Sequence, residues 1–346
     1  MSVGFLNIYK HYDGPFYIVA AKTFYDPVKI DQLKLETTLG PKYFAAHLPL
    51  YPILIRTVRE LIQLTGLRVN GLEYLKSMVG VNLLSTIGLV LFFYFLLKKF
   101  KLTKNPLILA SVLLFLPRFL VVRSVGAPES LFMLLILLSF FFFEKNRFWL
   151  AGLFGGLATM TKTPGILLFG AYGLVFLERW SKERRVNWNW LGVLLIPLGL
   201  LGVFGIYWKQ YGDFFAYFHS GNNIHLVFPY SVFNFQKSWV GTAWLEEILF
   251  YYFIYGLAII YLKNSKYRSF FYFGLVFFTA TLFIQHRDIS RYSLPLWPLA
   301  LIVFEKFFTS KKFWIIFIIL LPAIFLYAWN FLLFNVMPIS DWSAFL

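Results

Sequence analysis

Long apolar segments that recur along most of the chain are the feature that most restricts its fold. We delimit ten of them, at 78–97, 106–122, 130–143, 148–160, 164–177, 190–208, 248–262, 270–285, 293–308 and 313–332. Repeated apolar runs of this kind are typical of membrane-spanning helices. We therefore predict an all-α polytopic membrane protein, a bundle of about ten transmembrane helices.

The composition agrees with a membrane location. Of 346 residues, 59% are hydrophobic and 14% are charged, whereas soluble domains are about half apolar and a quarter charged. This excludes a soluble enzyme, a disordered chain and a nucleic-acid-binding domain, so we predict no nucleic-acid partner. The absence of cysteine excludes disulfides and thiolate nucleophiles.

Basic residues divide the short loops into two sets. The loops at 98–105, 144–147, 178–187, 263–268 and 305–312 hold 16 Lys and Arg residues, and the alternate loops after residue 77 hold seven. The positive-inside rule makes the first set cytoplasmic and the opposite face external. A single span over 148–177 would put the basic loop 178–187 outside. We therefore predict a break at Lys162-Thr163-Pro164-Gly165.

Some segments are short for a membrane span. A helix of 14 residues covers about 21 Å, against a hydrocarbon core of about 30 Å. We expect the external ends of 130–143 and 148–160 to lie below the membrane surface. This places Arg118, Arg123, Glu129 and Lys162 in a recess, where polar groups need protein or water around them.

Two external segments are long. The first is residues 1–77, and the second is the loop 209–247. Residues 78–346, which include that loop, form the predicted transmembrane bundle. The amphipathic stretch Ile53–Leu64 predicts a helix lying in the membrane interface. No signal peptide or span precedes residues 1–42. We expect that an N-terminal helix is missing, rather than that this segment crosses unaided.

A carboxylate near the N-terminus is the first candidate for chemistry. Asp13 stands in the sequence His11-Tyr12-Asp13-Gly14-Pro15-Phe16-Tyr17. Asp before Gly-Pro is also ordinary turn chemistry. The functional interpretation is a general base at the external membrane edge, acting on a hydroxyl with His11 and Tyr17 beside it.

The recess residues are the second candidate. Arg118, Arg123, Glu129 and Lys162 form either a structural charge pair, such as Arg123 with Glu129, or a cationic cradle for a phosphate. His47 either binds substrate or packs between helices. His219 and His225 are too far apart for a helical metal pair. We therefore predict no metal site, and the sequence gives no signal for a divalent cation.

The third candidate is His286-Arg287-Asp288-Ile289-Ser290-Arg291-Tyr292. If 287–291 is helical, Arg287 and Arg291 share a face, and Asp288 is also a neighbour of Arg291. Two guanidinium groups on one face suit a phosphate, because each forms paired hydrogen bonds with it. The alternative is a charged loop between two spans.

Several short stretches resemble a known family when they are taken in order. They are HYDGPFYIVA at 11–20, AHLPLYPILIR at 46–56, Pro128-Glu129-Ser130, LATMTKTPG at 157–165 and Arg291-Tyr292-Ser293-Leu294-Pro295. The set resembles the GT-C class of integral-membrane glycosyltransferases, within it the family of the second GPI mannosyltransferase and its prokaryotic relatives. That family has a helix before the Asp loop, often Trp-Asp where this chain has Tyr12-Asp13, and often Arg where it has Lys162.

The resemblance implies an inverting sugar transfer from a polyprenyl-phosphate donor to a glycan or glycolipid acceptor in contact with membrane lipids. Asp13 is the implied base. Arg287 and Arg291 are implied to bind the donor phosphate, with Arg123 and Lys162 as further cations, and no cofactor is implied. His11, His47 and Glu129 are implied to hold the acceptor sugar. Tyr17, His286 and Asp288 complete the predicted binding residues.

The sequence also suggests a cellular location and two alternative functions. We expect a multi-pass protein of a prokaryotic plasma membrane with its active site on the external face. A transporter or lipid flippase is the alternative, and it predicts inverted repeats, of which the sequence shows none. A non-catalytic scaffold is the third reading, and it predicts that the external charged residues are replaceable.

Overall fold

The computed structural model describes residues 9, 13–35, 39–64, 72–221 and 223–334. Within these ranges the regular elements are all helices, and no strand is formed. The prediction of an all-α membrane protein is confirmed. Helices occupy each of the ten predicted apolar ranges.

Eight of these ranges contain one principal helix each. They are α5 (Glu73–Lys99), α8 (Glu129–Glu144), α9 (Phe148–Thr161), α10 (Leu167–Glu183), α11 (Leu195–Tyr211), α12 (Glu246–Leu262), α13 (Arg268–Leu282) and α17 (Lys311–Phe334). A 3₁₀ segment, η3 (Trp188–Leu194), leads into α11. α8 and α9 are short, about 24 Å and 21 Å at 1.5 Å per residue.

The other two ranges are interrupted, which corrects the expectation of continuous spans. Range 106–122 forms α6 (Pro106–Leu113) and α7 (Pro117–Val122), and 293–308 forms η5 (Leu294–Leu296), α15 (Trp297–Val303) and α16 (Glu305–Phe308). Pro117 and Pro298 stand at the starts of α7 and α15. Proline suits a helix start because it has no N–H to donate to the preceding turn.

Three helices in the described part of the chain are long and apolar enough to cross a membrane. They are α5, the continuous η3–α11 segment Trp188–Tyr211, and α17. The number of complete crossings therefore stays a prediction. The polar start of the short helix α8 lies inside the protein. Glu129, at the start of α8, is only 2% exposed.

The predicted break between the fourth and fifth apolar ranges is present. α9 ends at Thr161, Lys162 is extended, and η2 (Thr163–Ile166) precedes α10. A Cβ at Gly165 would lie 2.5 Å from the backbone nitrogen of Thr159. Only glycine therefore permits this close return of the chain, which fixes the position of Lys162.

The N-terminal segment contains α2 (Gly14–Thr23), α3 (Pro27–Gln32), η1 (Pro41–Ala46) and α4 (Leu50–Leu64). The predicted helix at 53–64 is thus present as part of α4. α4 packs on α2 and α5 through Tyr51 and Ile55, both buried, while Arg56 and Glu60 are exposed. Its location in a membrane interface stays a prediction.

α9 packs closely against both α8 and α11. At Gly152 an added Cβ would lie 1.9 Å from the carbonyl oxygen of Gly192, so α9 and η3 touch backbone to backbone. The rings of Phe143 and Tyr172 stack with their centroids 3.9 Å apart, which joins α8 to α10.

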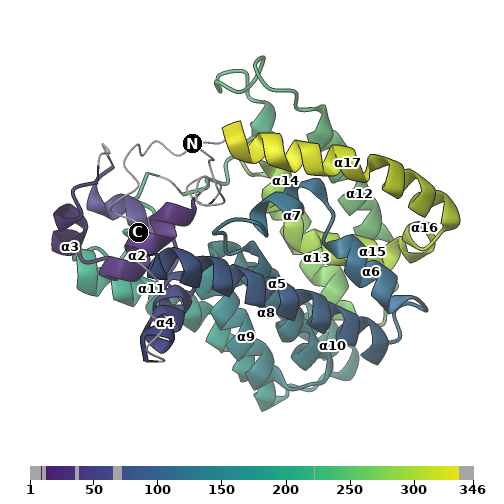
Figure 1. Ribbon diagram of the computed structural model, residues 1–346. Coiled ribbons are helices and arrows are strands. Elements are labelled where there is room, and N and C mark those ends of the chain that lie inside the picture. Colours follow the sequence, from purple (N-terminus) through teal and green to yellow (C-terminus); the bar gives the residue numbers. More distant parts are fainter. Residues whose placement is uncertain (1–8, 10–12, 36–38, 65–71, 222, 335–346) are drawn as a thin grey trace.

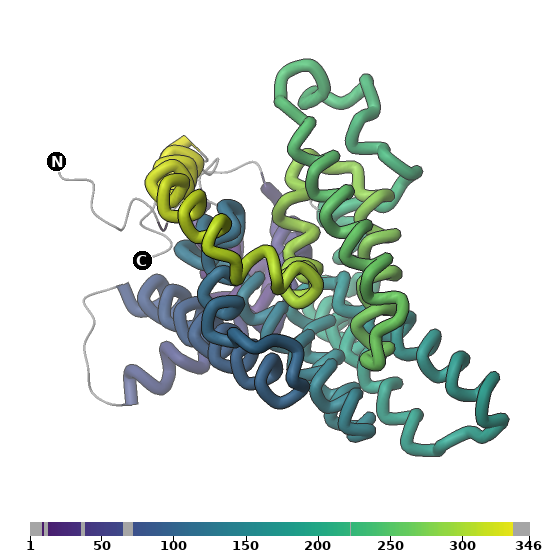
Figure 2. Tube along the Cα trace, turned by 90° about the vertical axis from the view of Figure 1, so that its right-hand side faces the viewer, coloured from purple at the N-terminus to yellow at the C-terminus, as the bar shows by residue number. Residues whose placement is uncertain are grey.

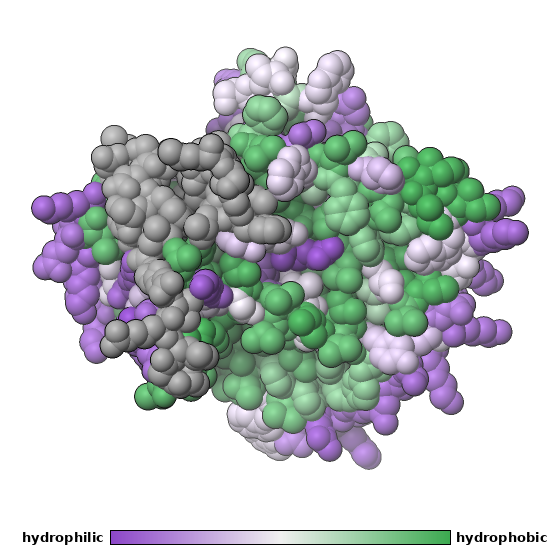
Figure 3. All heavy atoms as spheres, in the orientation of Figure 1, coloured by the Kyte–Doolittle hydropathy of each residue, from purple (hydrophilic) through white to green (hydrophobic). Residues whose placement is uncertain are grey.

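Helices from the C-terminal half of the chain complete the fold. α17 packs against α7 and extends across one side of the molecule (Figure 1). α12 and α13 stand side by side, and the connection that leads into α12 projects beyond their ends (Figure 2). In Figure 3, a small hydrophilic area lies among hydrophobic residues on the face seen in Figure 1.

Candidate active site

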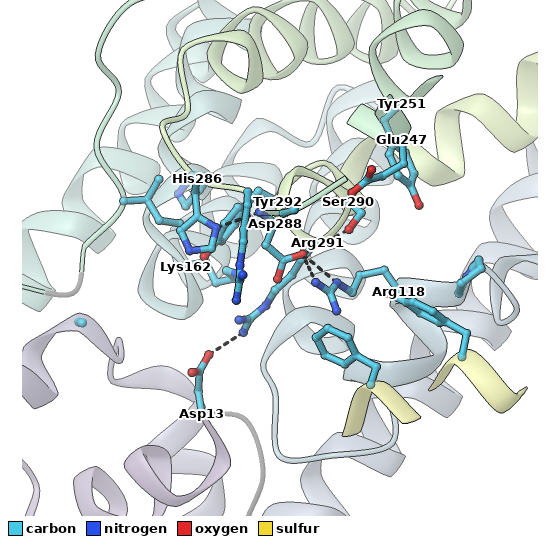
Figure 4. A pocket seen from close by; sticks show the side chains of 18 of the residues that line it. Asp13, Arg118, Lys162, Glu247, Tyr251, His286, Asp288, Ser290, Arg291 and Tyr292 are labelled. Atoms are coloured by element: carbon cyan, nitrogen blue, oxygen red, sulfur yellow. Dashed lines mark hydrogen bonds and ion pairs between the residues drawn. The ribbon is translucent and has the colours of Figure 1, made fainter. Parts of the chain in front are cut away.

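A cavity of about 1060 Å³ opens between the N-terminal segment, α7, α12, α17 and the 286–292 segment. Its volume is at the upper end of the range for small-molecule sites. The ionisable residues that line it include Asp13, Tyr17, Tyr43, His47, Arg118, Lys162, Tyr217, Glu247, Tyr251, His286, Arg287, Asp288, Arg291, Tyr292 and Tyr327. Figure 4 shows that its acidic and basic side chains come from separate elements and converge.

A chain of ion pairs runs along one wall of the cavity. Arg291 donates from Nη2 to Asp13 Oδ2 at 2.9 Å and from Nε to Glu129 Oε1 at 2.6 Å. Lys162 Nζ donates to the same Glu129 oxygen at 2.7 Å. Charge-assisted bonds of this length are strong. Glu129 is nearly inaccessible, whereas the Asp13 side chain is 32% exposed and faces the cavity.

Local structure explains why these side chains meet. Asp13 precedes α2, and its side chain makes no capping bond to that helix. Its carboxylate is therefore available to Arg291 (Figure 4). The short helix α14 (Ile289–Tyr292) buries Ile289 and turns Arg291 inward, where it is 8% exposed.

A second ion pair lies across the cavity. Arg118 donates from Nε to Asp288 Oδ1 at 2.8 Å, and its guanidinium lies 4.0 Å from the centroid of the Phe331 ring in α17. The Asp288 backbone N–H donates to His286 Nδ1 at 3.0 Å. Burial lowers the pKa of His286, which favours its neutral imidazole.

His47 lies beneath the Asp13 end of the cavity. It is 3% exposed, and its backbone oxygen accepts a 2.5 Å bond from the Tyr25 hydroxyl. The rings of Phe16 and Tyr17 pack on its imidazole, with centroids 5.1 and 4.9 Å away. Burial lowers the pKa of His47 to about 4, and within the described residues its Nδ1 has no hydrogen-bond partner.

The η1 segment, which directly precedes His47, is bound to the C-terminal end of α11 and to the loop that follows it. Lys42 Nζ and His219 Nδ1 both contact Asp213 Oδ2, at 3.0 and 2.8 Å. The hydrogen bonds from His219 and Lys42 lower the pKa of Asp213 to about 2. The Tyr211 hydroxyl donates to the oxygen of Pro41 at 3.1 Å. These contacts hold Tyr43 and His47 in place against the cavity.

The structure brings together most residues that the sequence singled out, with three exceptions. His11 lies outside the described residues. Arg123 does not line the cavity; it donates to the Leu114 oxygen and faces the Phe115 ring, so the pair with Glu129 is not formed. Arg287 lines the cavity but precedes α14, so it does not share a helical face with Arg291.

Sequence reasoning missed a group of cavity residues. They are Tyr43, Tyr217, Glu247, Tyr251 and Tyr327. The two residues from α12 are four positions apart, which puts them on one helical face. Glu247 stands in the first turn of α12, where an acid is favourable whether or not a cavity lies beside it. Lone tyrosines in an aromatic-rich chain carry no sequence signal that separates cavity lining from packing.

Comparison with known proteins gives the family. The model of glycosyltransferase family 87 matches residues 64–285. No curated protein and no solved structure matches the chain. The matched region contains Arg118, Glu129 and Lys162, and it covers more than half of the sequence. The chain is therefore a membrane glycosyltransferase that belongs to glycosyltransferase family 87.

Proposed function

We propose that this glycosyltransferase moves a hexose, in the first instance mannose, from a polyprenyl phosphate to a hydroxyl of a glycan or glycolipid. The transfer takes place on the external face of a prokaryotic plasma membrane, in a fold of the GT-C class. One observation carries the proposal: a single cavity holds the partly exposed Asp13 carboxylate beside a set of buried or half-buried cations. A base and a phosphate-binding group within one cavity are what this reaction requires.

Asp13 acts as the general base. An acceptor hydroxyl enters the cavity and gives its proton to the Asp13 carboxylate. The hydroxyl oxygen attacks the anomeric carbon of the donor, the bond from that carbon to the phosphate oxygen breaks, and the configuration inverts. The polyprenyl phosphate leaves with the bonding electron pair. The 2.9 Å bond to Arg291 orients the carboxylate for this role.

Cations stabilise the phosphate as it leaves. Arg287, Arg118, Lys162 and Arg291 all line the cavity. Within the described residues Arg287 has no carboxylate partner, whereas the other three are paired. Arg287 is therefore the first contact for the donor phosphate. Arg291 is the second contact for the phosphate, because it lies beside Asp13. Arg291 is only 8% exposed, and preorganised charge that is shielded from water is effective at such a position.

Other residues position these groups and the acceptor. Glu129 holds Arg291 and Lys162 together and is almost inaccessible, which supports a positioning role in place of the predicted sugar contact. His47 is neutral near pH 7 and offers a hydrogen bond to a sugar hydroxyl. Tyr17 and Tyr43 line the same end. No metal is assigned a step, because the cations of the chain supply the positive charge.

The proposal is tested by sugar transfer with purified protein in detergent. Donors are polyprenyl phosphates that carry mannose, glucose, galactose or arabinose, and the readout is released polyprenyl phosphate. We expect release with one donor, and its loss in Asp13→Asn. Asp31→Asn is the matched control, since Asp31 is an exposed carboxylate of the same segment. Equal release by wild type and Asp13→Asn would refute the role of Asp13.

A further inference from the structure

The cavity has two chemically different sides. On the side of α2 and η1, its lining carries the polar side chains of Asp13, Tyr17, Tyr43, His47 and Tyr217, together with Phe16, Ala46 and Leu48. On the opposite side the lining comes from α17 and is mainly apolar: Leu320, Ala323, Ile324, Tyr327, Phe331 and Phe334. A ligand that fills the whole cavity must therefore be amphipathic.

The α17 residues form one continuous stripe. Their positions, 320, 323, 324, 327, 331 and 334, follow the spacing of one helical face. The stripe extends about 21 Å along the helix at 1.5 Å per residue. Leu320, Tyr327 and Phe334 are 50%, 42% and 86% exposed, so packing within the described protein does not cover them. The stripe is long enough for several isoprene units.

The stripe leads directly to the cations. Phe331 contacts the Arg118 guanidinium, and Arg118 is bound to Asp288. Arg287, the residue before Asp288, lines the same cavity and is exposed. An apolar wall that reaches Arg118, in a cavity that Arg287 also lines without a carboxylate partner in the described chain, matches a lipid chain that ends in a phosphate.

We infer that the isoprenoid chain of the donor lies along this stripe of α17. Its phosphate is then at Arg287 and Arg118, and its sugar points toward Asp13. The acceptor enters from the opposite side, between Tyr43, His47 and Tyr217. This inference rests on the proposed function, because it assumes a polyprenyl-phosphate donor. It adds which helix holds the lipid and from which side each substrate enters.

The first test maps the chain directly on the wild-type protein. Undecaprenyl phosphate carrying a photoreactive diazirine on its third isoprene unit is irradiated with the protein in nanodiscs, and adducts are located by mass spectrometry. We expect adducts on 320–334 that an excess of unlabelled undecaprenyl phosphate removes. Competed adducts on other helices, with α17 unlabelled, would overturn the inference and leave the donor class intact. No competed adduct anywhere would count against both.

The second test fills the stripe. Ala323 faces the cavity, whereas Leu326 is 62% exposed on α17 and does not line it. We expect Ala323→Trp to raise the KM for the donor about tenfold, or about 1.4 kcal/mol, because the indole ring would occupy the space assigned to the lipid, and Leu326→Trp to leave it within about twofold. Equal KM values in both variants would overturn the inference. Since neither site is buried, both variants are expected to fold.

Discussion

Glu129 is the residue whose replacement tests the architecture of the site most severely. Its carboxylate is 2% exposed and binds Arg291 at 2.6 Å and Lys162 at 2.7 Å through the same oxygen. In Glu129→Gln the negative charge is lost, and Lys162 becomes a buried cation without a carboxylate. Removing one partner of a buried ion pair costs about 3–5 kcal/mol. Because Arg291 keeps Asp13, we expect the lower value, about 3 kcal/mol in the free energy of unfolding.

The measurement is reversible unfolding of the purified protein in mixed micelles. The control is Glu73→Gln, because Glu73 pairs with Arg59 at 3.2 Å with both side chains 27% exposed. Such a pair contributes at most about 1 kcal/mol. A double variant sharpens the test. Lys162→Met removes the stranded cation, so Glu129→Gln/Lys162→Met is expected to be more stable than Glu129→Gln alone by at least about 1 kcal/mol.

Two results would refute this reasoning. One is a loss in Glu129→Gln no larger than the loss in Glu73→Gln. The other is a double variant less stable than Glu129→Gln. Either would mean that Glu129, Lys162 and Arg291 are not coupled as their distances indicate. In the transfer assay, Glu129→Gln is expected to lower turnover about 100-fold, because a displacement of about 1 Å of a positioned group has that effect.

Three further predictions concern other parts of the chain. Burial lowers the pKa of His47 from 6.5 to about 4, so the unfolded chain takes up the proton at a higher pH than the folded one, and the free energy of unfolding falls as pH drops from 6.5 to 4. His47→Asn should reduce this fall when unfolding is measured as a function of pH. An unchanged dependence of the free energy of unfolding on pH would contradict the prediction. Gly165→Val forces a Cβ into the Thr159 backbone and should lower stability by more than 1 kcal/mol, whereas Gly173→Ala, where an added Cβ meets nothing within 4 Å, should change little. Arg287→Gln should raise the KM for the donor but leave the free energy of unfolding nearly unchanged, because Arg287 is exposed. An equal donor KM in the variant and the wild type would contradict a role of Arg287 in phosphate binding.

Much of the fold is predictable because it depends on local features. The lengths of the apolar segments predict where helices form. The alternation of basic and less basic loops, together with Thr163-Pro164-Gly165, locates the break beside Lys162. Interruptions at Pro117 and Pro298 are also local. A hydropathy pattern does not show them, because it does not depend on the backbone N–H that proline lacks.

The partners in the site are less predictable. The sequence predicts that Asp13, Glu129, Lys162 and Arg291 lie on the same face of the membrane, but not which of them touch. That depends on the rotation of each helix about its axis, which tertiary packing sets. The proposed pair of Arg123 with Glu129 failed for this reason, since Arg123 lies against Leu114 and Phe115.

The position of α17 is the least local feature. Its sequence resembles any apolar span, and nothing in it indicates that one face lines a cavity whose charges come from segments far away in the sequence. The contact of Phe331 with Arg118 joins residues that no short motif relates. Glu247 is similar, because an acid in the first turn of a helix is favourable there whether or not a cavity lies beside it.

The most direct test of the central claim is release of polyprenyl phosphate from its mannosyl form by wild type, Asp13→Asn and Asp31→Asn. Each variant is assayed at equal amounts of folded protein in the presence of membrane glycolipid acceptor. The account predicts release by wild type and Asp31→Asn, and a loss of about 10²–10⁴-fold in Asp13→Asn, the usual contribution of a general base. Release by Asp13→Asn at the wild-type rate would contradict it.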